Sequence, residues 1–209
     1  MQFLTDWIVV VIVGSLAVMS PGANFFITLR NSLKYSRRAG IYTALGLALG
    51  DLVHVSYCLI GIGVLIARSI VLFNVLKWVG AAYLVYIGVQ SLRSKAQVDS
   101  TVSNSKISHF DALSAIRIGF LTSLLNPKVS LFFLALFTQV IRPNTGLITQ
   151  AIYGITVAGI EFLWFATVAV LVSHAALRSR FLSISHWVDR VMGSILIGLG
   201  LRLAMTEHR

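Results

Sequence analysis

Charged residues are scarce in this sequence. Of its 209 residues, only 11% are Asp, Glu, Lys or Arg, whereas 57% are hydrophobic, and the mean hydropathy is +0.86. In soluble globular domains about a quarter of the residues are charged, so this composition is far from theirs. The composition therefore predicts an integral membrane protein without an appreciable soluble domain.

Cysteine is almost absent as well. Cys58 is the only one, and it lies inside an apolar segment. A single cysteine excludes an intramolecular disulfide, a Cys-x-x-Cys redox pair and a metal site built from several cysteines. The sequence also lacks a phosphate-binding loop, a Gly-x-Ser-x-Gly motif and the spacing of a catalytic triad. We therefore expect no enzymatic activity, no cofactor and no metal centre.

Acidic residues number 7 against 17 basic ones, which gives a formal net charge of +10. The basic residues do not form a patch with interleaved aromatic residues, as a nucleic-acid-binding surface would. They lie at the ends of apolar segments, a placement typical of loops that face the cytoplasm. The expected partner is therefore the lipid bilayer and not nucleic acid. Whether the chain forms a homo-oligomer is left open by the sequence.

Six apolar runs of roughly 18 to 30 residues are long enough to cross a bilayer, for which about 20 residues are needed. They lack the strict alternation of barrel strands. The predicted fold class is therefore all-α, a polytopic membrane protein with six transmembrane helices. The predicted spans are residues 7–29, 41–67, 75–92, 112–141, 147–174 and 188–205.

Two of the three prolines interrupt predicted spans. Ser20-Pro21-Gly22-Ala23-Asn24 falls within the first span, so neither half of that span is expected to cross alone, and Asn126-Pro127-Lys128 falls within the fourth. Proline removes a backbone donor and glycine loosens a helix. Irregular backbone at this depth is tolerated only where it is buried in protein or lines a watery cavity. Two broken helices at corresponding places in two halves point to a transporter's binding site.

Each break is predicted to start a new half-helix, with Ser20 or Asn126 as the cap and the following proline in the first turn. Such a helix end carries a partial positive charge and attracts a carboxylate. The N–H groups expected to point into the breaks are those of Gly22, Ala23, Asn24, Lys128 and Val129. A simple proline kink filled by packing is the alternative.

The acidic residues within the spans are the other candidates. Asp51 and His54 are three residues apart and share a helix face, as a site for a substrate ammonium group or a proton would require. His54 could equally just hydrogen-bond Asp51 or nearby backbone. Glu161 is the favoured proton site, or else a structural partner of Lys128, whose charge calls for an anion. Gly46 is four residues from Gly50, a spacing typical of close helix packing.

The polar, serine-rich stretch 94–108 divides the chain. We predict a first three-helix half at residues 1–93, a flexible cytoplasmic linker at 94–108 and a second half at 109–209. Because three is odd, the second half enters the membrane from the opposite side. Each half opens with a proline-broken span and carries one acid in its second span, which indicates an inverted repeat.

Several motifs together resemble the LysE/RhtB family of bacterial amino-acid exporters. The matching stretches are Ser20-Pro21-Gly22-Ala23-Asn24, Ala44-Leu45-Gly46 with Gly50 and His54, Gly80-Ala81-Ala82-Tyr83-Leu84-Val85-Tyr86-Ile87-Gly88, and Gly119-Phe120 leading to Asn126-Pro127-Lys128 and Phe132-Phe133. The resemblance implies a six-span carrier in the bacterial inner membrane that exports amino acids such as lysine, arginine, threonine or homoserine, driven by the ion gradient. The family pattern usually has proline where Ala23 stands and often a polar amide where Ser123 stands.

We therefore expect a secondary transporter that exports a zwitterionic amino acid by alternating access, driven by the proton gradient. The half-helix ends with Lys128 would hold the carboxylate, and Asp51 the ammonium group. The predicted substrate-binding residues are Pro21, Gly22, Ala23, Asn24, Asp51, His54, Asn126, Pro127 and Lys128, and the predicted proton-coupling residues are Glu161 and Asp51. A cation or metal exporter using Asp51, His54 and Glu161 and a non-transporting membrane subunit are the alternatives.

The distribution of basic residues predicts the orientation. Ten Lys and Arg residues lie in the connections after the first, third and fifth spans, against at most five on the opposite side. The positive-inside rule then places both termini outside the cytoplasm. Single cysteines placed at 94–108 in a Cys58→Ala background should therefore be shielded from an impermeant thiol reagent added to intact cells. Ready labelling there would reverse the orientation.

Overall fold

The computed structural model describes residues 2–20, 22–68, 111–142 and 145–173, together with isolated positions in 75–93 and 190–201. Pro21, the predicted linker 94–108 and most of the predicted third and sixth spans lie outside the described residues. The predicted division into halves is therefore untested, and four of the six predicted spans can be followed.

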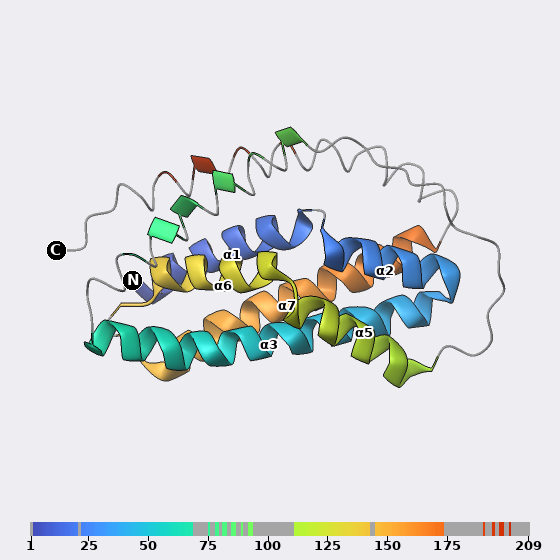
Figure 1. The fold of residues 1–209 in the computed structure, drawn as a ribbon, viewed down its shortest axis with the longest axis horizontal. Coiled ribbons are helices and arrows are strands. Elements are labelled where there is room, and N and C mark those ends of the chain that lie inside the picture. Colours follow the sequence, from blue (N-terminus) through green and yellow to red (C-terminus); the bar gives the residue numbers. More distant parts are fainter. Residues whose placement is uncertain are drawn as a thin grey trace.

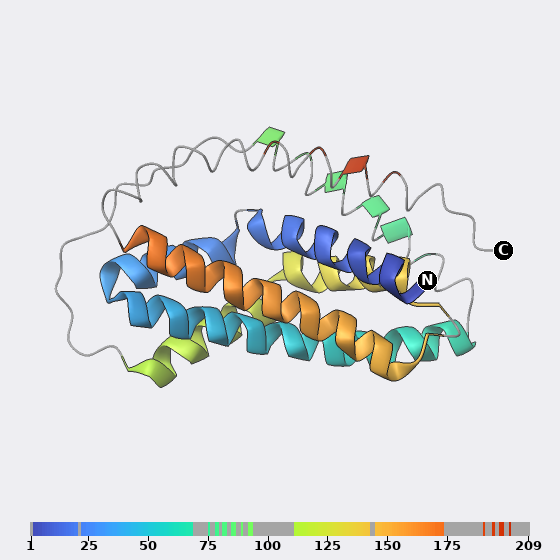
Figure 2. The same cartoon turned by 180° about the vertical axis from the view of Figure 1, so that it is seen from behind.

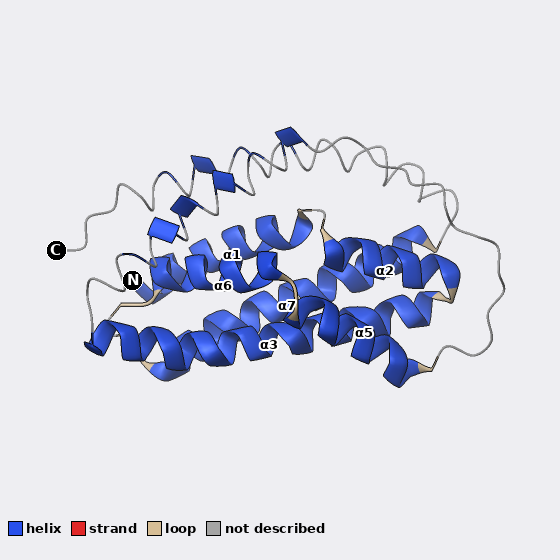
Figure 3. Cartoon of the chain, viewed as in Figure 1, coloured by secondary structure: helices blue, strands red, loops and turns tan. Residues whose placement is uncertain are grey.

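Every described element is a helix, and no strand occurs in this part of the chain (Figure 3). This confirms the all-α class. The helices are α1 (Gln2–Met19), α2 (Ala23–Lys34), α3 (Arg37–Arg68), α5 (Ala112–Leu124), α6 (Pro127–Val140) and α7 (Leu147–Val172). Three of them are long and apolar enough to cross a membrane, namely α1, α3 over Arg37–Gly61, and α7. The pair α5 and α6 forms a fourth candidate, bent by 59°.

Helix α1 differs from the prediction that neither half of the first span crosses alone. It begins at Gln2, five residues before the predicted start, and its 18 residues suffice for a span. In this polar front end the Asp6 carboxylate is paired with Arg142.

The two longest helices, α3 and α7, run the length of the bundle in opposite directions (Figures 1 and 2). Helices α1 and α6 occupy one end, and α2 and α5 occupy the other. The chain runs through α1 and α2 in one direction along the bundle and through α5 and α6 in the reverse direction. Both breaks therefore lie near the middle of the bundle.

The buried apolar side chains form two separate clusters. One joins α1, the second half of α3, α6 and the first half of α7, and includes Val55 and Val157. The other joins the last turn of α1, α2, the first half of α3 and the second half of α7, and includes Leu47 and Phe165. Along α3 and α7 the positions between the clusters belong to Asp51 and Glu161, so the acids lie between two apolar cores.

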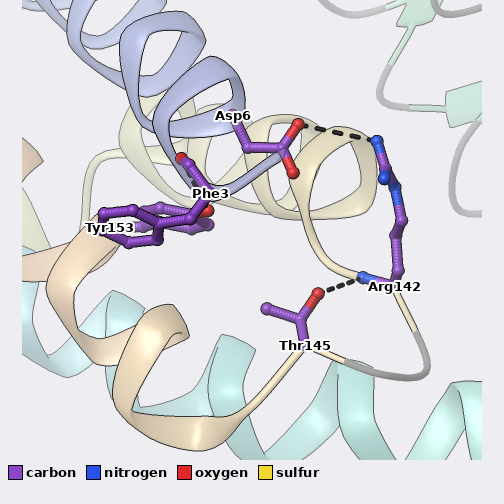
Figure 4. Close-up of polar contacts among 5 residues, drawn as sticks. All are labelled: Phe3, Asp6, Arg142, Thr145 and Tyr153. Atoms are coloured by element: carbon purple, nitrogen blue, oxygen red, sulfur yellow. Dashed lines mark hydrogen bonds and ion pairs between the residues drawn. The ribbon is translucent and has the colours of Figure 1, made fainter. Parts of the chain in front are cut away.

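At one end, α1 is fastened to the corner between α6 and α7 (Figure 4). Asp6 Oδ1 lies 3.5 Å from Arg142 Nη2, and the backbone N–H of Arg142 donates to Thr145 Oγ1 at 2.9 Å. The Phe3 ring stacks on Tyr153 with centroids 5.8 Å apart. These contacts hold the start of α1 against the start of α7.

Glycines bring α3 and α5 into backbone contact, as the spacing of Gly46 and Gly50 predicts. A Cβ atom at Gly46 would run into the carbonyl oxygen of Ile116, and one at Gly119 would run into that of Thr43. At Gly50 an added Cβ would lie 2.7 Å from Ser123 Cβ. The close crossing matters for the site because it presses Ser123 of α5 against the α3 face that carries Asp51.

Gly46→Ala tests this crossing. Overpacking costs about 1–3 kcal/mol, and here the obstacle is backbone that cannot rotate away. We expect a lower midpoint of thermal unfolding for the purified protein in detergent. Gly159→Ala is the matched control, since nothing lies within 4 Å of a Cβ added there and alanine favours a helix. Equal midpoints for the two variants would contradict the close crossing.

Candidate functional site

Buried polar side chains converge between the two apolar clusters. Those of Asp51, Ser123, Glu161, Ser20 and Asn24 are each at most 7% exposed, and they come from α3, α5, α7 and the first break with its following helix. Buried polar groups need hydrogen-bond partners, because an unpaired one costs free energy. The contacts among them therefore define the site.

The first break does not have the predicted cap. Helix α1 ends at Met19, and the residue before α2 is Gly22, in an extended conformation, without a side-chain hydrogen bond to the first turn. Ser20 therefore does not cap α2, contrary to the prediction. Its carbonyl oxygen instead accepts a hydrogen bond from Lys128 Nζ at 2.9 Å.

The second break follows the prediction closely. Asn126 caps α6, its side-chain Oδ1 accepting from the backbone N–H of Lys128 at 3.0 Å, and Pro127 is the first helical residue. The N–H of Val129 donates to the Asn126 carbonyl oxygen at 3.0 Å. These two N–H groups are therefore already engaged within the protein, although the sequence led us to expect that they point into the break.

A chain of amides connects the two breaks with α7. Asn126 Nδ2 donates to Asn24 Oδ1 at 3.0 Å, and Asn24 Nδ2 donates to Glu161 Oε1 at 2.7 Å. Amide orientations are often ambiguous, but this chain starts at a backbone N–H, which can only donate. The orientation of each amide along the chain follows from that anchor.

Lys128 reaches from α6 across to the first break. Besides its bond to the Ser20 carbonyl, it lies over Gly22, where an added Cβ would be 3.5 Å from Nζ. The Ser20 carbonyl follows directly on the C-terminal end of α1, which carries a partial negative charge and so favours a cation. Lys128 thus bridges the two breaks.

The two acids lie next to each other across α3 and α7. The Asp51 and Glu161 carboxyl groups interact directly, and they are 0% and 3% exposed. Ser123 Oγ donates to Asp51 Oδ1 at 2.8 Å. Asp51 Oδ2 has no hydrogen-bond donor among the described residues.

His54 binds the backbone of α5 instead of Asp51. Its Nε2 lies 3.0 Å from the Ser123 carbonyl oxygen, and its Nδ1 lies 2.6 Å from the Tyr57 hydroxyl. Because a carbonyl oxygen can only accept, Nε2 carries a proton. The ring stacks on Phe133 with centroids 5.9 Å apart. His54 therefore holds Ser123 in place, and Ser123 in turn binds Asp51.

A small cavity opens at the two breaks. It has a volume of ≈ 40 Å³, enough for roughly three water molecules. Its polar lining comes from both breaks and from α7, and its apolar lining comes from α1, α6 and α7. The lining residues are Ala17, Val18, Ser20, Gly22, Asn24, Asn126, Lys128, Val129, Phe132, Glu161 and Phe165.

The predicted site residues divide into three groups. Gly22, Asn24, Asn126, Lys128 and Glu161 line the cavity together. Ala23, Pro127, Asp51 and His54 do not line it, the first two being exposed and the last two lying behind Glu161 and Ser123. Pro21 lies outside the described residues.

Two contributors were missed by the sequence reasoning. Ser123 links His54 to Asp51, and Tyr57 completes the hydrogen bonds of His54. The spacing of Asp51, His54 and Tyr57 at three-residue intervals could have indicated that Tyr57 shares their face. Among the described residues, no group of three or more His, Cys, Asp or Glu side chains could hold a metal ion.

Comparison with known proteins places this site in a family. Residues 15–207 match the family described as LysE type translocator. An uncharacterized membrane protein of Vibrio cholerae is 30% identical over 202 residues, which is 96% of this chain and 97% of the relative. The homoserine/homoserine lactone efflux protein of Salmonella typhimurium is 27% identical over 217 residues, 97% of each chain.

The threonine efflux protein of Escherichia coli is 28% identical over 210 residues, which is 99% of each chain. No solved structure matches the chain. The match over most of the chain and the apolar helices identify a multi-pass membrane protein and confirm the resemblance inferred from the motifs. The protein belongs to the LysE type translocator family.

Proposed function

We propose that this protein is a secondary transporter that exports amino acids across the bacterial inner membrane, driven by the proton gradient. The observation that carries the proposal is the cavity at the two helix breaks, which is lined by one acid and one base, Glu161 and Lys128. Family membership supports it, as do relatives named as threonine and homoserine efflux proteins.

The charges around the cavity suit a zwitterion. A free amino acid carries one ammonium group and one carboxylate, and the cavity offers one carboxylate and one ammonium group in return. Charge-assisted hydrogen bonds of this kind are about twice as strong as neutral ones. We assign the substrate ammonium group to Glu161 in place of Asp51, because Glu161 lines the cavity and Asp51 does not.

The remaining lining favours a substrate with an uncharged side chain. Val129, Phe132 and Phe165 form the apolar part of the cavity, and Glu161 is its one acidic residue among the described positions. A second substrate ammonium group, as in lysine, would have no carboxylate partner there, and burying it unpaired would be costly. Threonine or homoserine suits these surroundings better.

The volume of the cavity fits water but no amino acid. We infer that this small volume belongs to a contracted form of the site in the proposed alternating-access cycle. Opening the site requires the segments on either side of the breaks to move apart.

An inverted six-span arrangement is part of the proposal. Its support is that α1–α2 runs opposite to α5–α6 and α3 opposite to α7. The helix contacts also correspond: Gly14 packs on Val157, four residues before Glu161, and Gly119 packs near Leu47, four residues before Asp51. With both termini outside, the stretch 94–108 would face the cytoplasm.

Release of labelled amino acids from expressing cells tests the function. Cells should release threonine or homoserine faster than empty-vector cells, and Glu161→Gln and Lys128→Gln should each lower the rate at least tenfold. One lost charge-assisted hydrogen bond costs about 1.5–3 kcal/mol, or one to two decades in affinity. Arg30→Gln, which removes an exposed charge on α2, is the control and should export normally.

The amide of the exported amino acid probes the carboxylate contact, since it lacks that group. Wild-type protein should bind it poorly, whereas Lys128→Gln should discriminate less between acid and amide. Release of divalent metal ions in place of amino acids would favour a metal exporter. No release of either would favour a non-transporting membrane subunit.

A further inference from the structure

The acid pair between α3 and α7 has one unmatched oxygen atom. Asp51 is completely buried, and its Oδ1 accepts from Ser123, but its Oδ2 has no donor among the described residues. Its neighbour is the Glu161 carboxyl group, which as an anion can only accept. Two adjacent buried carboxylates without a donor between them repel each other, and a single shared proton removes the conflict.

The amide chain restricts where that proton can lie. Asn24 Oδ1 accepts from Asn126, so the Asn24 NH₂ group must face Glu161, and Glu161 Oε1 must accept from it. Oε1 is therefore occupied as an acceptor. The Ser123 hydroxyl occupies Asp51 Oδ1 in the same way. The preferred atoms for a shared proton are therefore Asp51 Oδ2 and Glu161 Oε2, to which no described donor is directed.

We propose that Asp51 and Glu161 hold one shared proton when the cavity contains no amino acid, and that the ammonium group of an incoming amino acid displaces it. This rests on the proposed export function and adds a mechanism of coupling to it. Glu161 touches the substrate, whereas Asp51 acts through Glu161 as a positioning residue. One amino acid is thereby exchanged for one proton at the same pair.

At the acid pair itself the charge is the same in both states, whereas the whole site, with Lys128 and the zwitterion counted, becomes one charge more negative when the proton leaves. With a shared proton, the pair carries one negative charge. With the proton released to water in the cavity, the pair carries two negative charges and the bound ammonium group one positive charge, which again leaves one. The substrate carboxylate meets Lys128 in the second state only. Occupation by the proton and by the substrate therefore exclude each other, as exchange requires.

Few other charged groups face the pair. His54 on α3 interacts electrostatically with Glu161 but is held by Ser123 and Tyr57. Lys128 on α6 lies across the cavity. Arg30 on α2 and Arg117 on α5 are exposed. Asp6, the remaining charge on α1, is paired with Arg142 at the end of the bundle (Figure 4).

The shared proton can be tested without any substrate. Infrared difference spectra of purified protein at neutral pH should show the carbonyl band of one protonated carboxyl group. Asp51→Asn and Glu161→Gln should each abolish it, and Asp6→Asn should retain it. Absence of the band from the wild-type protein would overturn the shared proton, even if every variant misfolds.

Coupling is tested by binding L-threonine and L-homoserine to the purified protein in weak buffer with a pH indicator. We expect release of about one proton per bound amino acid, and an affinity that rises about tenfold per pH unit as long as the empty pair holds its proton. In Asp51→Asn this pH dependence should disappear, whereas Asp6→Asn should keep it.

Binding without proton release would refute the coupling while leaving the exporter function intact. If neither amino acid bound and expressing cells exported none, the proposed function and the coupling would both be wrong. The infrared band would then still decide whether the proton is shared.

Discussion

Placing two carboxyl groups side by side in the middle of an apolar helix bundle is the constraint on which this structure depends. An isolated ionised group in such a medium costs several kcal/mol or more unless it is paired or neutralised. Each carboxyl group accepts a hydrogen bond from a neighbouring element. Asp51 accepts from the Ser123 hydroxyl, and Glu161 accepts from the Asn24 amide. Apolar clusters flank the pair on either side along the bundle.

The helix breaks supply what intact helices could not. Within a continuous helix, the carbonyl and N–H groups near Ser20 and Asn126 would satisfy each other. Interrupting both helices at the same depth leaves a carbonyl for Lys128 and places Asn24 and Asn126 within reach of each other. The polar groups of the cavity therefore come largely from the breaks, and the acid of α7 completes them.

How far the sequence predicts this site depends on how local each interaction is. The Asn126 cap follows from an Asn-Pro pair whose geometry needs nothing beyond the next two residues, and it was predicted. The cap at Ser20 was predicted by the same rule and is wrong, because α2 begins only at Ala23, so that Gly22 and not Ser20 precedes the helix. The proximity of Asp51 to Glu161 depends on how α3 packs on α7, and neither residue's neighbours along the chain reveal it. Gly46 lies between these cases, since its spacing from Gly50 predicts a close contact without naming α5 as the partner.

The helix contacts also differ in how strongly they resist the opening that export requires. Helix α5 meets α3 backbone to backbone at Gly46 and Gly119, so any sliding there forces main-chain atoms together. Helix α1 meets α7 through side chains at Val157 opposite Gly14, and at the exposed end its Asp6 is paired with Arg142, which precedes α7. Side chains can change rotamer and an exposed ion pair contributes little, so separating α1 from α7 costs less than separating α5 from α3. Because Ser20 follows directly on α1, such a movement would also draw the Ser20 carbonyl away from Lys128 and leave that ammonium group to a substrate carboxylate.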